Sequence, residues 1–362
     1  MADLQDDAPT VPGVGALDPV PATEATAPAG DRPDSPTRAS VLLAAHPIAD
    51  GYNALPWTLR RLPWHVLDTC ENTVDTDIPR LRAGGVGAQF WSLLVPDSVA
   101  ADPARLVIES LEQIDVARTL VRRYPDGLSL STCVDEMADA RNRGRIASFL
   151  GPVSGRALTD SLGALRAFHA LGVRSVAPAG ADWIERGMTA FGMEVVQEIN
   201  RLAMLIDLAG CGPTEAQQLI AASKAPVLIS HTAANALTEH PENVSDEVLT
   251  ALRAAKGLCM VTFTAVQVSS ASPATIHDVA DHLDHIREVA GPACVGLGGA
   301  YGIEARRAQG LEDASGYPRL IAELLDRGWP DRDISLLAWG NAQRVLRDAE
   351  FTARAAQHRL LT

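Results

Sequence analysis

The sequence has few lysines, no paired cysteines and no long apolar run, and each shortage excludes a class of protein. Only Lys224 and Lys256 occur among the 31 basic residues, which we attribute to GC-rich coding. The five cysteines form no Cys-x-x-Cys pair, which disfavours a disulfide framework or a zinc–cysteine site. No apolar run approaches the roughly 20 residues that span a bilayer, and no signal peptide is recognisable. We therefore expect a soluble, cytoplasmic protein.

The charge balance limits the possible partners. The net charge of −14 argues against nucleic acid, because phosphate contacts need clustered basic residues. It argues equally against an anionic membrane. A small-molecule substrate or ligand is the expected partner.

The chain divides into a tail and one large domain. Residues 1–40 are rich in Pro, Ala, Asp and Thr without bulky periodicity, so we predict a disordered tail. Residues 41–362 are predicted to form a single domain that ends in closing helices from Gly310 to Leu361. Amphipathic stretches such as Leu162–Leu171 and Asp278–Val289 predict helices between the apolar runs.

Eight short apolar runs predict a parallel sheet covered on both faces, because they are rich in Val, Ile and Leu without alternation. The predicted strands are Val41–Ala45, Val86–Val95, Ile146–Gly151, Val173–Ala177, Met204–Leu208, Val227–Ser230, Leu258–Phe263 and Val295–Gly298. Eight strands separated by helices favour an α/β fold of the (β/α)8 TIM-barrel type. A doubly wound sheet is the alternative, but no Gly-x-Gly-x-x-Gly follows the first strand.

Several ordered motifs carry a family resemblance. The most specific are Thr76–Arg82 and Gly84–Ser92, supported by Gly192–Leu208, Ala225–Leu237 and Val295–Gly298. With them the chain resembles the renal (membrane) dipeptidase family of metallopeptidases from about Ala49 to Leu346. The resemblance implies a metallo-dependent-hydrolase-like barrel that carries two zinc ions bridged by a glutamate at the C-terminal ends of the strands.

The positions that the resemblance assigns to the metal hold mostly other residues. A histidine and an aspartate are expected where Tyr52 and Ala54 stand, the bridging glutamate where Val153 stands, and a histidine where Gly210 stands. Only the sixth-strand histidine is present, as His231. Since a catalytic zinc ion needs about three protein ligands, we expect no metal and no other cofactor. A working metallodipeptidase is therefore not expected.

The positions that the resemblance assigns to the substrate have also changed. A histidine is expected at Gly180, the arginine that holds a substrate carboxylate at Glu242, and an aspartate at Ala300. An anion at Glu242 would repel the carboxylate that an arginine would hold.

Five residues remain as candidates for other chemistry. His231 acts as a general acid or base, or persists as an inert inherited residue. Tyr52 donates a proton or hydrogen bond to substrate, or fills the vacated metal volume. Arg156, Glu242 and Tyr301 are predicted to bind substrate, with the alternative that Arg156 and Glu242 pair with each other or with solvent.

Two functions stay open at this point. The first is a repurposed, metal-independent enzyme that acts on a small, fairly apolar molecule by isomerisation, elimination or cyclisation, in specialised-metabolite biosynthesis. The second is a non-catalytic pseudoenzyme that binds a ligand or stabilises a partner. Residual dipeptide hydrolysis is a weaker alternative. Lysine-imine chemistry is disfavoured because Lys224 and Lys256 precede predicted strands. The resemblance also implies a homodimer.

Overall fold

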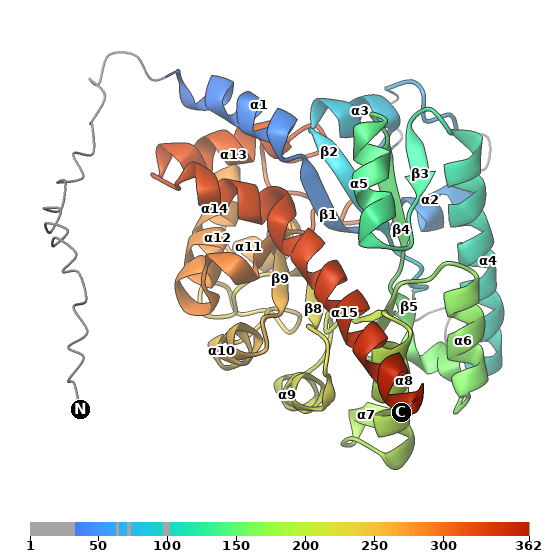
Figure 1. The fold of residues 1–362 in the computed structure, drawn as a ribbon. Coiled ribbons are helices and arrows are strands. Elements are labelled where there is room, and N and C mark those ends of the chain that lie inside the picture. The colour runs from blue at the N-terminus through green and yellow to red at the C-terminus, as the bar shows by residue number, and fades with distance from the viewer. Residues whose placement is uncertain (1–32, 63–64, 71–73, 97–101, 362) are drawn as a thin grey trace, which may run out of the picture. The chain divides into compact units, whose positions relative to one another are not determined.

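Ten short strands, all paired in parallel, form the centre of the fold (Figure 1) within the residues that the structure describes. The structure is a computed structural model that describes residues 33–62, 65–70, 74–96 and 102–361. The strands are β1 (Ile48–Asn53), β2 (Val86–Trp91), β3 (Leu128–Leu130), β4 (Ile146–Leu150), β5 (Val153–Ser154), β6 (Ser175–Ala177), β7 (Leu205–Ile206), β8 (Leu228–Thr232), β9 (Leu258–Val261) and β10 (Val295–Leu297).

The strands close into a (β/α)8 barrel. A seven-stranded sheet has the order β3-β4-β2-β1-β10-β9-β8, and a three-stranded sheet has the order β5-β6-β7. Two isolated bridges join the sheets, Leu150 with Val173 and Asp207 with Leu228. The closed ring therefore runs β1-β2-β4-β6-β7-β8-β9-β10, and β3 lies outside it on β4. This confirms the predicted barrel.

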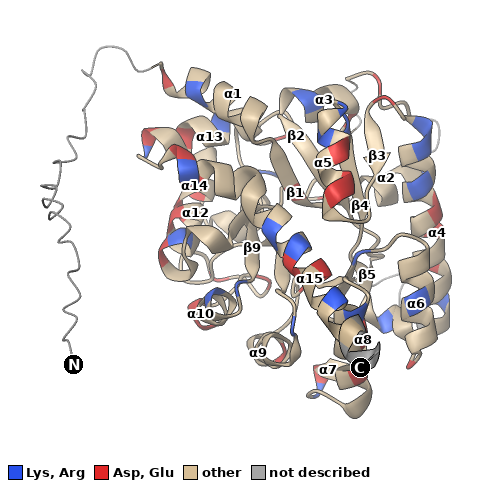
Figure 2. Cartoon of the chain, in the orientation of Figure 1, with Lys and Arg blue, Asp and Glu red and all other residues tan. Residues whose placement is uncertain are grey.

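Helices surround the strands and carry most of the charge, as Figure 2 shows. The helices that follow the strands around the ring are α2 (Leu55–Arg61), α3 (Ile78–Ala83), α4 (Pro103–Arg123), α5 (Val134–Asn142), α6 (Leu162–Ala170), α7 (Asp182–Glu185), α8 (Ala190–Arg201), α9 (Pro213–Ala222), α10 (Asp246–Ala254), α11 (Ala265–Val268) and α12 (Ile276–Ala290). The others, at the two ends of the folded chain, are α1 (Ser35–Ala45), α13 (Tyr317–Asp326), α14 (Asp331–Ser335) and α15 (Asn341–Leu361). Short 3-10 and π segments lie at Gly155–Leu158 (η1), Pro292–Cys294 (η2) and Leu336–Gly340 (η3).

Seven of the eight predicted strands overlap an observed strand, and the first prediction is wrong. Val41–Ala45 belongs to α1, and the first strand is β1. A short run of Val, Leu and Ala fits a buried strand or a helix equally well. Asp34 decides the outcome here, because its side chain caps α1 by accepting from the Thr37 N–H.

The remaining boundaries need smaller corrections. The predicted end of the tail at residue 40 falls inside α1, while residues 1–32 lie outside the described residues. Helices α6 and α12 confirm the two predicted helices. The segment from Gly310 to Leu361 contains α13, α14 and α15, and η3 meets α15 at Gly340 and Asn341.

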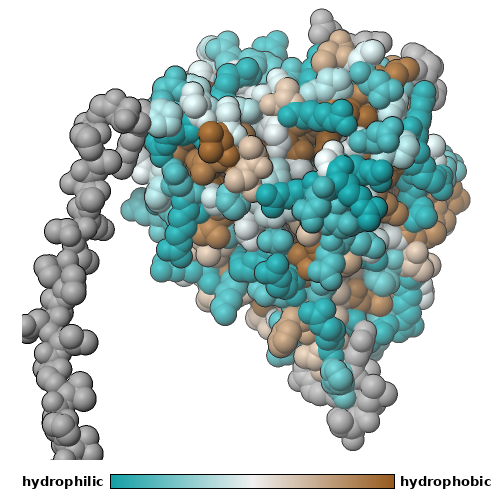
Figure 3. Space-filling view, turned by 45° about the horizontal axis from the view of Figure 1, so that its top comes forward, coloured by the Kyte–Doolittle hydropathy of each residue, from teal (hydrophilic) through white to brown (hydrophobic). Residues whose placement is uncertain are grey.

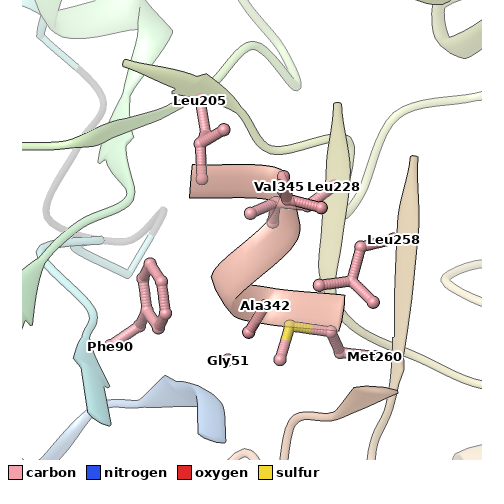
Figure 4. Close-up of a pocket in the computed structure, with 8 residues that line it drawn as sticks. All are labelled: Gly51, Phe90, Leu205, Leu228, Leu258, Met260, Ala342 and Val345. Carbon is pink, nitrogen blue, oxygen red and sulfur yellow. The ribbon is translucent and has the colours of Figure 1, made fainter. Parts of the chain in front are cut away.

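The end of the barrel where the strands begin is closed by α15, which appears as the long red helix in Figure 1. Ala342 and Val345 of this helix meet Leu205, Leu228 and Leu258, the first residues of three strands. Only a small apolar cavity remains between them (Figure 4). The opposite end, where the strands finish, is the end at which (β/α)8 barrels carry their active sites.

The surface is mixed in character. Figure 3 shows separate apolar patches among hydrophilic residues on the face drawn. Among the residues that the structure describes, no helix combines the length and the apolar character needed to cross a membrane.

Candidate functional site

Tyr52 and His231 meet at the mouth of the barrel. Tyr52 lies near the end of β1 and His231 near the end of β8. Their ring centroids are 3.9 Å apart, with 32° between the ring planes. The structure thus brings together the two residues predicted to be catalytic, because the carboxyl ends of all the barrel strands lie on the same rim.

His231 is held at one nitrogen only. Its Nδ1 lies 2.8 Å from the Ser230 hydroxyl, and Nε2 has no hydrogen-bond partner among the described residues. Desolvation lowers the pKa of His231 to about 4. The imidazole is therefore neutral at pH 7 and offers Nε2 to a ligand.

Tyr52 is only 6% exposed. Burial raises the pKa of its phenol to about 12, and the hydrogen bond of the Ser92 side chain opposes this rise. The charges of Asp207 and Glu242 raise this pKa further, and the charge of Arg307 lowers it. At neutral pH Tyr52 is a protonated phenol and thus a hydrogen-bond donor.

Asp207 fixes the strand end that carries His231. It is fully buried, and its Oδ1 accepts from the N–H groups of Ala209 (3.1 Å) and Ser230 (2.9 Å). Its Oδ2 is buried without a hydrogen-bond partner among the described residues. Burial raises the pKa of Asp207 to about 6, and the hydrogen bonds of Ser230 oppose this rise. The carboxyl thereby links the ends of β7 and β8.

Asp50 has the same role on the other side of the ring. Its Oδ1 accepts from the N–H groups of Tyr52 (3.1 Å) and Gly299 (3.0 Å), and its Oδ2 accepts from the Tyr317 hydroxyl at 2.7 Å. Burial raises the pKa of Asp50 to about 6, and the Tyr317 hydrogen bond opposes this.

The three residues predicted to bind substrate lie in different places. Glu242 is exposed on the loop after β8, where its Oε2 accepts from Gln267 Nε2 at 3.2 Å. Arg156 lies in η1 with its Cδ close to Gly180. Tyr301 is fully buried beneath the mouth, and its hydroxyl donates to backbone carbonyls. Substrate binding by Arg156, Glu242 and Tyr301 stays a prediction.

Sequence reasoning missed several residues that shape the site. Ser92, Asp207 and Ser230 were visible as polar residues at the ends of apolar runs, where side chains approach the mouth. Arg307 gave no such signal. Its side chain is 3% exposed, and its Nη2 donates to the carbonyl of Ala300.

Comparison with known proteins places the chain in a family. A family model described as membrane dipeptidase (peptidase family M19) matches residues 37–360. The chain belongs to the membrane dipeptidase family. It is 38% identical over 334 residues to dipeptidase 3 of Mus musculus and 37% identical over 333 residues to that of Homo sapiens. Each match covers 86% of this chain. It spans only 66% of the mouse protein and 67% of the human protein.

Solved structures agree on the fold. A metallopeptidase from Rhodobacter sphaeroides, liganded with a phosphinate mimic of the dipeptide L-Ala-D-Ala, matches with a TM-score of 0.76 at 22% identity. That match covers 84% of this chain and 99% of the other. The probable dipeptidase PvdM from Pseudomonas aeruginosa matches with a TM-score of 0.81 at 18% identity, over 88% and 99% of the two chains. At these identities the likeness establishes the barrel alone.

The residues present do not fit the two zinc ions that the family resemblance implies. Ala54, Val153 and Gly210 offer no ligand atom, and the high pKa of Tyr52 keeps its phenol protonated. Within the described ranges, no group of three or more His, Cys, Asp or Glu side chains is arranged to hold a metal ion. Tyr52 and Ala54 instead pack with Ala300 in a small apolar cluster.

Proposed function

We propose that this member of the membrane dipeptidase family is a metal-independent enzyme that acts on a small, fairly apolar molecule by acid/base chemistry. The contact between Tyr52 and His231 at the barrel mouth is the observation that carries the proposal. The reaction class is an isomerisation, elimination or cyclisation, in which protons move and no water is added. A place in specialised-metabolite biosynthesis is part of the proposal.

The protonation states suit such a reaction. Both rings are neutral at pH 7, since the pKa of His231 is lowered to about 4 and that of Tyr52 is raised to about 12. His231 Nε2 can take a proton from a carbon or heteroatom of the ligand while Tyr52 donates one to a ligand oxygen. A coupled transfer of this kind avoids placing a single uncompensated charge in a desolvated site.

Ser230 and Asp207 support this assignment of roles. The Ser230 hydroxyl oxygen lies 2.8 Å from His231 Nδ1 and can accept from the Nδ1–H, while the Ser230 backbone N–H donates to Asp207 Oδ1 at 2.9 Å. That arrangement leaves Nε2 unprotonated and able to act as the base. We infer that Ser230 and Asp207 position His231 and select its tautomer.

The decisive experiment compares turnover of candidate pathway intermediates by the wild type and by His231→Gln and Tyr52→Phe. General acid/base groups contribute roughly 10²–10⁴-fold to reaction rate, so the turnover rate of each variant should fall by at least about 100-fold. Circular dichroism should show that each variant keeps its fold. His285→Gln is the matched control, because His285 pairs with Asp246 on the surface. Unchanged turnover in both site variants would contradict the proposal.

A non-catalytic binding or partner-stabilising protein is the second candidate. The cluster of Tyr52, Ala54 and Ala300, with Leu94 and Ile303 against it, favours this candidate because a plug fills space without performing chemistry. It predicts that His231→Gln and Tyr52→Phe leave the cellular role intact. Residual dipeptide hydrolysis stays a weaker alternative. The homodimer also stays a proposal, which light scattering on the full chain would test.

A further inference from the structure

A cavity opens beside β8, and it shares no lining residue with the apolar gap at the other end of the barrel. Its empty volume is about 670 Å³ including its open side. We call it the β8 cavity. It is lined by Leu208, Gly210, Cys211, Pro213, Ala216, Ile229, Thr232, Asn235, His240, Pro241, Glu242, Asn243, Val244, Ser245 and Val248.

The lining of the β8 cavity contains no lysine or arginine. Glu242 contributes a carboxylate, and no basic side chain of the described residues lies within ion-pair distance of it. Asn243 donates both hydrogens of Nδ2, to the carbonyls of Thr238 and Gln267, and its Oδ1 is buried without a partner. Since Asn243 Oδ1 is buried, the Glu242 carboxylate is the negatively charged group that the wall presents to a ligand.

The loop that carries Glu242 is well ordered. Asn235 and Val244 are held together by a backbone hydrogen bond of 2.9 Å, and Thr232 Oγ1 donates to the Glu242 carbonyl at 2.9 Å. The Glu242 N–H donates to His240 Nδ1 at 3.2 Å. Gln267 holds Oε2, which leaves Oε1 free among the described contacts. A preorganised carboxylate costs less to engage than a flexible one.

The floor of the β8 cavity is apolar. Leu208 is buried just after β7, Ile229 is buried within β8, and Val248 is buried on α10. Apolar pockets with a few placed polar groups are typical of sites for small molecules. A ligand with a short hydrocarbon portion and one cationic end matches this distribution.

We propose that the β8 cavity binds the amine-bearing end of a small molecule, with Glu242 as the counter-charge to its ammonium group. The inference deepens the proposed function, since it names the substrate class of the same mouth. Glu242 lies close enough to Tyr52 for its charge to raise the phenol's pKa. Thr232 of the cavity wall follows His231 directly in β8, so the cavity lies near the proposed acid/base pair.

Three probes of similar shape and different charge test this inference. They are 2-phenylethylamine, 3-phenylpropanoate and 2-phenylethanol, titrated into the full chain at pH 7 and followed by ligand-observed NMR and calorimetry. The wild type should bind the amine roughly tenfold more tightly than the other two, the usual advantage of a charge-assisted hydrogen bond. Glu242→Gln should abolish this preference, and Glu242→Arg should shift it to the carboxylate.

Glu239→Gln is the matched control, because Glu239 is exposed on the same loop and does not line the β8 cavity. It should bind the amine as the wild type does. Absence of a preference for the amine, or an amine affinity unchanged in Glu242→Gln, overturns the proposal.

Binding of the probes is independent of turnover, so the two proposals can fail separately. Suppose that amine binding depends on Glu242 while Tyr52→Phe and His231→Gln leave turnover unaffected. This result would support amine binding in the β8 cavity and refute the proposed acid/base function. The reverse result would support the proposed acid/base function and refute the proposal of a cationic ligand.

Discussion

Replacing Asp207 by asparagine should change how the stability of the protein depends on pH. Asp207 is fully buried, and its Oδ1 accepts two backbone N–H groups that an asparagine Oδ1 can also accept. Burial raises the pKa of this carboxyl from 3.8 to about 6. The wild type must therefore ionise a buried group at neutral pH, and the variant need not.

The sign and size follow from proton linkage. Since the folded state holds the proton more tightly than the unfolded chain, the contribution of Asp207 to the free energy of unfolding falls as pH rises from about 4 to about 6. A pKa raised from 3.8 to about 6 corresponds to about 3 kcal/mol. The unfolding free energy of Asp207→Asn, minus that of the wild type, should thus increase by about 3 kcal/mol between pH 4 and pH 7.

Urea unfolding of both proteins at several pH values between 4 and 7.5 measures this difference. The variant also buries an amide Nδ2 without an acceptor, at a cost of about 1–3 kcal/mol. That cost is the same at every pH, so the slope tests the argument and the absolute value does not. A difference that stays constant, or that decreases with rising pH, would refute the reasoning.

Glu198→Gln provides a control of opposite sign. Hydrogen bonds from Arg201 and Arg166 lower the pKa of Glu198 to about 2. Its stabilising contribution is present above the unfolded pKa of 4.5 and is lost as pH falls toward about 2. This variant should therefore be less stable than the wild type at pH 7, and the gap should narrow below about pH 4.5.

Three further predictions follow from the site. In Asp207→Asn, which removes the carboxyl whose pKa is raised to about 6, the rate of the proposed reaction should be constant from about pH 5 to 8, because the pKa of His231 is lowered to about 4 and that of Tyr52 is raised to about 12; a pH–rate profile of this variant with a midpoint near 6.5 would contradict a desolvated His231. Tyr317→Phe removes the hydroxyl that donates to Asp50 and should cost about 1.5–3 kcal/mol of unfolding free energy in urea at pH 7, whereas no measurable loss would mean that Asp50 is satisfied otherwise. Purified protein should contain no stoichiometric zinc and should not cleave dipeptides when zinc is added, as elemental analysis and a hydrolysis assay can check; near-stoichiometric zinc with robust cleavage would show that the metal positions were misassigned.

Much of the barrel could be predicted from the sequence, because a buried parallel strand is marked by its composition alone. The failures came where composition is ambiguous or the element is very short. Val41–Ala45 suits a helix as well as a strand, and the capping contact of Asp34 decided for the helix. Strands β3 and β5, with three and two residues, are too short to leave a pattern.

The candidate site was predictable only in part. The meeting of Tyr52 and His231 followed from the rule that strand ends converge. The full burial of Tyr301 could not be predicted in this way, because it depends on the backbone turn at Ala300, where φ is 54°. The β8 cavity was also unpredictable, since it depends on how the loop between Ala233 and Val244 folds back on itself.

Two buried carboxyls, Asp50 and Asp207, hold the backbone at the barrel mouth in place. Asp50 joins the backbone of β1 to that of the β10 end through Tyr52 and Gly299. Asp207 joins the β7 end to β8 through its contact with Ser230. Each carboxyl accepts N–H groups that would otherwise be unsatisfied at a strand end, and leaving such groups unpaired costs about 1–3 kcal/mol each. These hydrogen bonds tie β1 to β10 and β7 to β8 without any metal ion. A rim held in this way can acquire new chemistry by replacing side chains while its backbone geometry is kept.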